Sequence, residues 1–200
     1  MKRLLLLTLL FTTPLFAQSA ATIWVSAQQN RGGGDLVGDD DIRAEFDDGH
    51  GFGVSVARRI RQSPLSAELS MFRTTSGAEL TDDVESLSIG DVKLLSTMGM
   101  LRWHFRAGQP LDVYAGAGIA YVVTGELSSA AMRAEGINPI TLDDPFVWVA
   151  GGGVTYDFTP RLGVALDARY MPVELRRTNG EPTSAGLDPL LVSAGLRIRF

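Results

Sequence analysis

The 200-residue sequence contains no cysteine. Disulfide-stabilised folds, zinc sites built from thiolates and catalytic cysteines are therefore excluded. The sequence also lacks an uninterrupted apolar run of about 20 residues, the length that a helix needs to cross a membrane. If this chain resides in a membrane, it must cross the membrane with β-strands.

The chain also lacks an excess of positive charge. Its formal net charge is −5, and loss of the two basic residues Lys2 and Arg3 with the leader described below lowers it by two, to −7. A nucleic-acid-binding domain normally presents a basic surface. We therefore expect no nucleic acid among the partners of this protein.

Residues 1–17 have the features of a secretory signal peptide. A short basic start is followed by an apolar run over residues 4–11, and residues 15–17 (Leu-Phe-Ala) precede the expected cleavage site. The sequence thus predicts an exported protein whose residues 18–200 form a single domain.

The last segment, residues 188–200, alternates strictly between two kinds of side chain. Every second residue from Leu190 to Phe200 is apolar, and the residues between them include Ser193, Arg197 and Arg199. This period predicts a strand with one apolar and one polar face. An aromatic residue that ends such a strand is typical of bacterial outer-membrane β-barrels, in which the last strand is recognised by the assembly machinery.

Seven earlier segments alternate in the same way, and the connections between them are long and short in turn. The segments are residues 21–28, 49–60, 65–75, 90–105, 111–124, 145–158 and 162–175. An even number of strands with short turns at one end and long loops at the other is typical of outer-membrane barrels. The sequence therefore predicts an all-β fold, an eight-stranded antiparallel up-and-down transmembrane β-barrel. A periplasmic lipocalin-like barrel or β-sandwich is the alternative.

If the apolar face meets lipid, the other face lines the lumen and carries charges of both signs. Buried charges are costly unless they pair, so we expect an ion-pair network in the half of the barrel nearest the short turns. The network is predicted to contain Glu68, Arg102, Asp112, Asp167, Arg169, Arg197 and Arg199, with Arg59, His104 and Asp157 on the same face.

The inward positions of the other half are small or apolar. The interior of an eight-stranded barrel is filled by side chains or holds one small ligand. The predicted channel-lining residues are Phe72, Met98, Met100, Gly116, Gly118, Val147, Val149, Gly151 and Gly153. The glycines either make room for a ligand or relieve the curvature of a tight barrel, and both interpretations stay open.

Pro172 is predicted to interrupt the seventh strand. Proline has no backbone N–H and therefore cannot donate a hydrogen bond to a neighbouring strand. The interruption either opens the barrel wall sideways or marks the point where the strand has left the membrane, and the sequence does not choose between these outcomes.

No catalytic, metal or cofactor site is expected. His104 shares its face with Ser96, which is too distant on the same strand, and with Ser193 on the last strand, but no third partner is evident. His50 lies at a loop–strand junction beside Asp47 and Asp48. The aspartate pairs and triplets do not have the spacing of a calcium loop.

Several stretches resemble the OmpW family of small outer-membrane proteins. They are residues 90–93, 101–105, 148–154 and 187–200 together with the run Tyr114-x-Gly116-Ala117-Gly118-x-x-Tyr121. The resemblance implies a narrow, largely apolar channel for passive uptake of small hydrophobic or detergent-like molecules, which leave sideways into the membrane. The expected partners are membrane lipid, such a molecule and the assembly machinery that reads the strand ending in Phe200. A structural or surface-contact barrel that transports nothing is the alternative.

Overall fold

A computed structural model describes residues 19–35, 43–60, 63–81, 86–124, 142–176 and 184–200. The predicted signal peptide lies outside these ranges. Within them the chain forms eleven strands: β1 (Ser19–Gln29), β2 (Gly33–Asp35), β3 (Arg43–Arg59), β4 (Leu65–Thr81), β5 (Ser86–His104), β6 (Leu111–Thr124), β7 (Phe146–Asp157), β8 (Leu162–Tyr170), β9 (Glu174–Arg176), β10 (Ser184–Gly186) and β11 (Leu190–Arg199).

Eight of these strands close into a ring in which each strand pairs with its neighbours in antiparallel register. The order is β1, β3, β4, β5, β6, β7, β8 and β11, and β1 pairs with both β3 and β11. Ser19 and Phe200 complete the closure with hydrogen bonds in both directions, at N···O distances of 3.1 and 3.0 Å. The predicted eight-stranded antiparallel barrel is confirmed.

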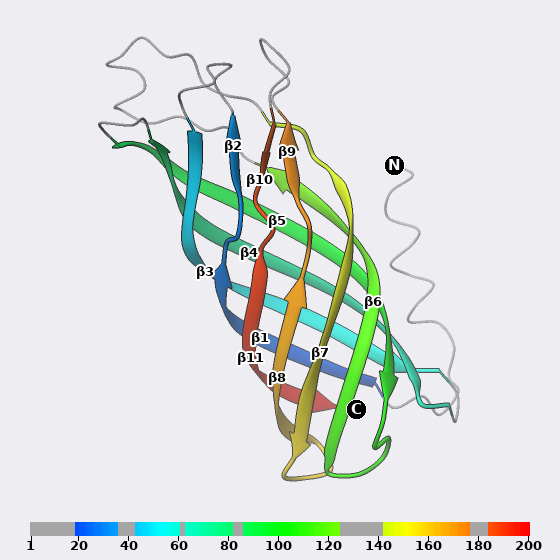
Figure 1. The fold of residues 1–200 in the computed structure, drawn as a ribbon. Helices are drawn as coiled ribbons and strands as arrows, with labels where there is room; N and C mark the ends of the chain where they lie inside the picture. The colour runs from blue at the N-terminus through cyan, green and yellow to red at the C-terminus, as the bar shows by residue number, and fades with distance from the viewer. Residues whose placement is uncertain (1–18, 36–42, 61–62, 82–85, 125–141, 177–183) are drawn as a thin grey trace, which may run out of the picture.

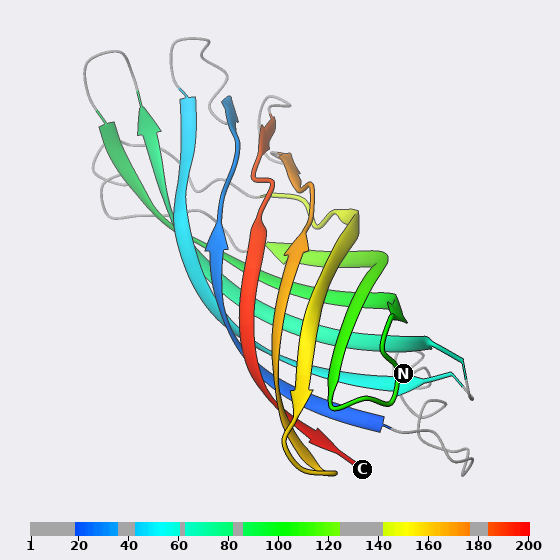
Figure 2. The same ribbon diagram turned by 60° about the horizontal axis from the view of Figure 1, so that its bottom comes forward.

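The two ends of the barrel differ (Figures 1 and 2). The short turns and the C-terminus lie at one end, which we name the turn end. At the other end, the extended end, the short strands β2, β10 and β9 continue the lines of β1, β11 and β8, and β2 also pairs with β3.

Some strands reach further at the extended end than the sequence predicted, whereas the seventh is shorter, because β8 ends at Tyr170 instead of residue 175. β3 begins at Arg43 instead of Gly49, and β4 continues to Thr81 instead of Thr75. In these extensions the apolar residues, such as Phe46 and Ala78, are few and lie among charged and small ones, so the alternation of apolar and polar residues on which the prediction depended is weak there.

The two faces of the wall are opposite in character to those of a water-soluble barrel. On β1, Ile23 and Val25 are about two-thirds exposed on the outside, whereas Trp24 between them is buried inside. Ion-pairing residues such as Glu68 and Arg169 are buried in the lumen. Among the described residues, no helix is long and apolar enough to cross a membrane.

Glycines allow the narrow lumen to hold large side chains, because each of five such side chains lies directly across the ladder from a glycine. The pairs are Trp24 with Gly195, Phe72 with Gly53, Arg102 with Gly116, Tyr114 with Gly153 and Arg169 with Gly151. A Cβ atom on Gly195 would lie 2.7 Å from the indole of Trp24, and one on Gly53 would lie 2.6 Å from the ring of Phe72. The glycines are therefore required by the packing of the lumen.

This packing predicts that Gly153→Ala destabilises the barrel. The added methyl group would meet the Leu166 carbonyl and would lie 2.6 Å from the Tyr114 hydroxyl oxygen, so we expect the free energy of unfolding to fall by about 1–3 kcal/mol. Gly99→Ala is the matched control, because a Cβ atom there has no neighbour within 4 Å. Urea unfolding of barrels refolded into lipid vesicles measures both variants, and equal stabilities would contradict this account.

Candidate functional site in the barrel lumen

Four charged side chains from three strands form an ion-pair layer across the middle of the lumen. Arg102 on β5 pairs with Glu68 on β4 and lies 3.6 Å from Asp167 on β8. Arg169, also on β8, reaches Glu68 at 3.0 Å and Asp167 at 2.5 Å. All four residues are buried, so the layer balances two arginines with two carboxylates away from bulk water.

Aromatic and hydroxyl groups surround this ion-pair layer. The Tyr114 hydroxyl donates a hydrogen bond to Asp167 at 2.5 Å, and Arg169 donates one to Ser70 Oγ at 2.8 Å. The Arg102 guanidinium lies 4.4 Å from the centre of the Tyr114 ring, and that of Arg169 lies 4.9 Å from the centre of the Phe72 ring. These contacts hold the arginines in place through cation–π attraction as well as charge.

A second cluster lies nearer the turn end and was not predicted from the sequence. The Ser66 Oγ and His104 Nε2 atoms are 2.7 Å apart, and His104 Nδ1 is 2.7 Å from Asp112 Oδ2. Arg59 approaches the same carboxylate at 3.8 Å. The hydroxyl next to His104 is thus that of Ser66, on β4, instead of Ser96 or Ser193.

The residues of this second cluster come from four adjacent strands, β3 to β6. Alternation along β4 places Ser66 on the same face as Glu68, so its inward direction was readable from the sequence. Its contact with His104 depends on the register between β4 and β5, in which Ser66 pairs with Arg102. No turn motif in the sequence fixes that register, which is why the cluster was missed.

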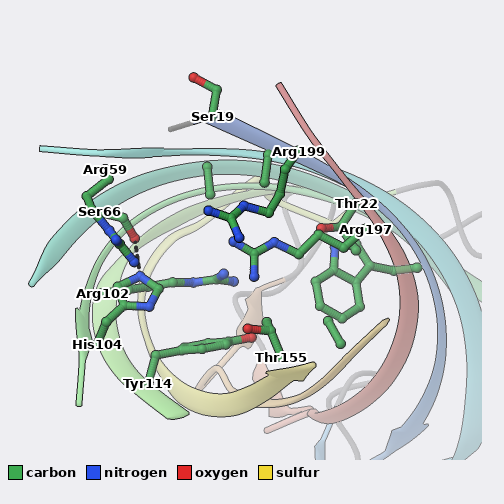
Figure 3. Close-up of a pocket in the computed structure, with 14 residues that line it drawn as sticks. Ser19, Thr22, Arg59, Ser66, Arg102, His104, Tyr114, Thr155, Arg197 and Arg199 are labelled. Carbon is green, nitrogen blue, oxygen red and sulfur yellow. Dashed lines mark hydrogen bonds between the residues drawn. The ribbon is translucent and has the colours of Figure 1, made fainter. Parts of the chain in front are cut away.

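A third group at the turn end contains the two arginines of the last strand. Arg199 pairs with Asp157 Oδ2 at 2.8 Å, whereas Arg197 Nη1 is 3.8 Å from Asp157 Oδ1. Figure 3 shows both guanidinium groups directed toward the middle of the barrel. The seven predicted network residues thus divide into three groups along the lumen, and Asp157 and Arg59 complete them.

Apolar side chains fill the lumen between the ion-pair layer and the extended end. Phe72, Met98 and Val149 are buried there, and Val147 packs against them. The same cluster includes Trp24, which the sequence reading left out. It also includes Val92, Leu94, Met171, Val173, Leu175, Leu187 and Leu191.

The remaining predicted channel residues lie at or near the level of the ion-pair layer. Gly116 and Gly151 lie beside the side chains of Arg102 and Arg169, and Gly153 lies beside Tyr114. Met100 is paired with both Glu68 and Gly118. The space at Gly116, Gly151 and Gly153 is therefore occupied by the side chains of the charged network and Tyr114.

The wall is interrupted beside the apolar part of the lumen. β8 ends at Tyr170, which pairs with Ala150 of β7. Residues 146–149 of β7 lie further toward the extended end and have no partner in β8. Pro172 lies in this interruption. Nearer the extended end, two hydrogen bonds of 2.9 Å connect Asp143 with Arg176. The Asp143 N–H donates to the Arg176 carbonyl, and the Arg176 N–H donates to the Asp143 carboxylate.

The missing donor of Pro172 faces β7. Met171 N–H donates to Pro189, and the Val173 carbonyl accepts from Leu187, so both residues bond to the β10–β11 side. Because successive residues of an extended chain direct their backbone groups to opposite sides, the nitrogen of Pro172 is directed toward the β7 side. The interruption between β7 and the segment from Met171 to Val173, which we name the β7–β8 gap, thus coincides with the proline.

A protein-family model described as outer membrane protein beta-barrel domain matches residues 4–200 of this chain. The chain matches none of the curated protein sequences.

Solved structures share the fold at low sequence identity. The outer membrane protein OprG from Pseudomonas aeruginosa is 14% identical, with a TM-score of 0.78 over 92% of this chain and 95% of that chain. AlkL, solved in DMPC lipid bilayers, is 15% identical, with a TM-score of 0.61 over 94% and 93% of the two chains. The Escherichia coli outer membrane protein W is 16% identical, with a TM-score of 0.53 over 91% and 98%.

The ion-pair layer predicts strong energetic coupling between Glu68 and Arg169. Arg169→Met alone would leave two buried carboxylates short of a partner, so the free energy of unfolding should fall by about 3–5 kcal/mol. In the double variant with Glu68→Gln, the total loss of unfolding free energy should be at least about 1 kcal/mol smaller than the sum of the losses in the two single variants. Urea unfolding of the two single variants and the double variant measures this cycle.

The exposed pair of Glu174 and Arg176, 3.2 Å apart and more than half exposed, is the control. The same cycle there should show no measurable coupling, because water screens an exposed pair. Additive losses at Glu68 and Arg169 would contradict a coupled layer.

Proposed function

This chain belongs to the outer membrane protein beta-barrel domain family and is a protein of the bacterial outer membrane, and from that premise we propose that it is a passive conduit for small hydrophobic molecules. The β7–β8 gap beside an apolar lumen is the observation that carries the proposal. A molecule that enters from the extended end would leave through this gap into the membrane.

The ion-pair layer supports a sideways exit. A hydrophobic molecule that continued along the barrel axis would have to separate Glu68 and Asp167 from their arginines, and breaking such buried pairs is costly. The layer therefore acts as a floor beneath the apolar cluster. Passage requires side chains above this floor to move, and the flexible Met98 and Met171 suit that requirement because methionine adapts readily to new packing.

The β7–β8 gap has suitable chemistry and size. Val173 and Leu175 are buried along its inner side, and Trp148 is half exposed on its outer side. The gap extends along the strands for about six residues, or roughly 20 Å, between the last ladder pair and the Asp143–Arg176 hydrogen bonds. The gap in the ladder thus lies between an apolar interior and the lipid-facing surface.

The resemblance to the OmpW family supports the same function. The run from Tyr114 to Tyr121 and the segments that resemble the family in β5, β7 and β11 lie in the walls of this lumen. Membrane lipid surrounds the barrel, and the assembly machinery would read β11, whose terminal Phe200 is exposed.

We also infer that the barrel is not an enzyme, although Ser66, His104 and Asp112 have the hydrogen-bond order of a catalytic triad. Acyl transfer needs hydrogen-bond donors directed at the developing oxyanion. Ser66 lies inside a strand between Arg59 and Arg102, so its backbone N–H belongs to the ladder. The hydrogen bonds of this cluster then have a structural role, because they supply partners to the buried polar groups of Asp112 and His104.

Uptake of a hydrophobic substrate tests the conduit. Pro172→Val supplies the missing donor toward β7, so we expect closure of the β7–β8 gap and a several-fold lower rate of uptake into liposomes containing the barrel. Pro160→Val, in the β7–β8 turn at the far end, is the matched control and should leave uptake unchanged. Equal uptake with and without the wild-type protein would instead favour a structural or surface-contact barrel.

A fluorophosphonate probe tests the absence of catalysis. We expect mass spectrometry to find no adduct on Ser66 after incubation of the folded barrel with the probe, because the backbone N–H of Ser66 is engaged in the strand ladder and cannot stabilise a developing oxyanion. An adduct on Ser66 that disappears in a His104→Gln variant would show an activated nucleophile and overturn this inference.

A further inference from the structure

The lumen opens at the turn end into a pocket lined by four arginines. Arg59, Arg102, Arg197 and Arg199 surround it together with Tyr114 and Thr155, and Figure 3 shows their side chains converging from opposite walls. The open space at its centre is about 30 Å³, which exceeds the room needed by a single water molecule. We name this space the mouth pocket.

The side chains that line the mouth pocket are positively charged on balance. None of the described lining residues is a carboxylate. The acids that balance the arginines lie outside this lining. Arg102 pairs with Glu68 and lies 3.6 Å from Asp167, and Arg59 lies 3.8 Å from Asp112. Asp157 serves both Arg197 and Arg199, and its 3.8 Å separation from Arg197 is too long for a hydrogen bond. The Arg197 guanidinium is therefore only partly neutralised.

Two buried donors at the mouth pocket have no hydrogen-bond partner in the protein. They are the Thr155 hydroxyl and the Nε–H group of Arg102. Each residue is about 5% exposed, and a buried donor without a partner carries a desolvation cost. Together with Arg197, these donors are suited to an acceptor with several oxygens, such as a carboxylate or a phosphate.

We propose that the mouth pocket binds one small oxyanion, a carboxylate or a phosphate group, from the periplasmic side. Short turns of outer-membrane barrels face the periplasm, so the pocket opens there. The ion-pair layer separates it from the apolar lumen, and the proposal is independent of the conduit function. The same chemistry is available from a free anion and from the headgroup of an anionic phospholipid in the inner leaflet.

Calorimetric titration tests the site with the full barrel in uncharged maltoside micelles, which carry no phosphate. Inorganic phosphate and acetate represent free anions, and a short-chain phosphatidylglycerol represents the headgroup. We expect saturable binding of at least one probe. Arg197→Gln should weaken it about tenfold, equivalent to about 1.4 kcal/mol.

A second variant and a charge control make the result specific. Thr155→Val removes only the unpartnered hydroxyl and keeps the side-chain shape, so the barrel should fold normally and bind about threefold more weakly. Arg161→Gln removes one positive charge from an exposed turn at the same end, outside the mouth pocket, and should leave affinity unchanged.

The outcomes separate the two sources of the anion. Binding of phosphate or acetate that weakens in Arg197→Gln identifies a free-anion site. Binding of the phospholipid alone with the same loss identifies a headgroup site. Absence of binding by all three probes overturns the proposal, as does an equal loss of affinity in Arg161→Gln and Arg197→Gln.

Discussion

Lipid offers no hydrogen-bond partner to a peptide group, and most of this structure follows from that constraint. Each strand must satisfy its N–H and C=O groups on both sides, so the sheet has to close on itself. Closure forces one face of every strand outward into lipid and the other into a narrow lumen. The polar residues of the sequence therefore gather inside, where the remaining problem is to satisfy them with one another.

Much of this arrangement was readable from the period of the sequence. Alternation assigned Ile23, Leu101 and Leu196 to the outside and Glu68 and Arg169 to the inside, and the structure has the same assignment. The period also placed the charged residues nearest the short turns. These features depend only on the direction of each side chain, which a strand fixes locally.

Features that depend on the register between strands were not predictable. The approach of Ser66 to His104 is one example, and the placement of five large side chains opposite glycines is another. The glycines themselves were visible in the sequence, but their partners were not. Trp24 was not predicted as a lumen residue, although it alternates with the outward-facing Ile23 and Val25 and is therefore directed inward. β2, β9 and β10 were missed because three residues are too few to show a period.

Closure of the ring by β1 and β11 has a consequence for the kinetics of assembly. The two strands that form this seam are the first and the last of the described chain, and Ser19 and Phe200 bond to each other directly. Contacts between such distant segments form slowly, because the entropy of the whole intervening chain must be lost first. Until the seam forms, both strands present unpaired edges that invite pairing with another chain. The time spent with an open seam is therefore the interval in which this protein is most exposed to aggregation.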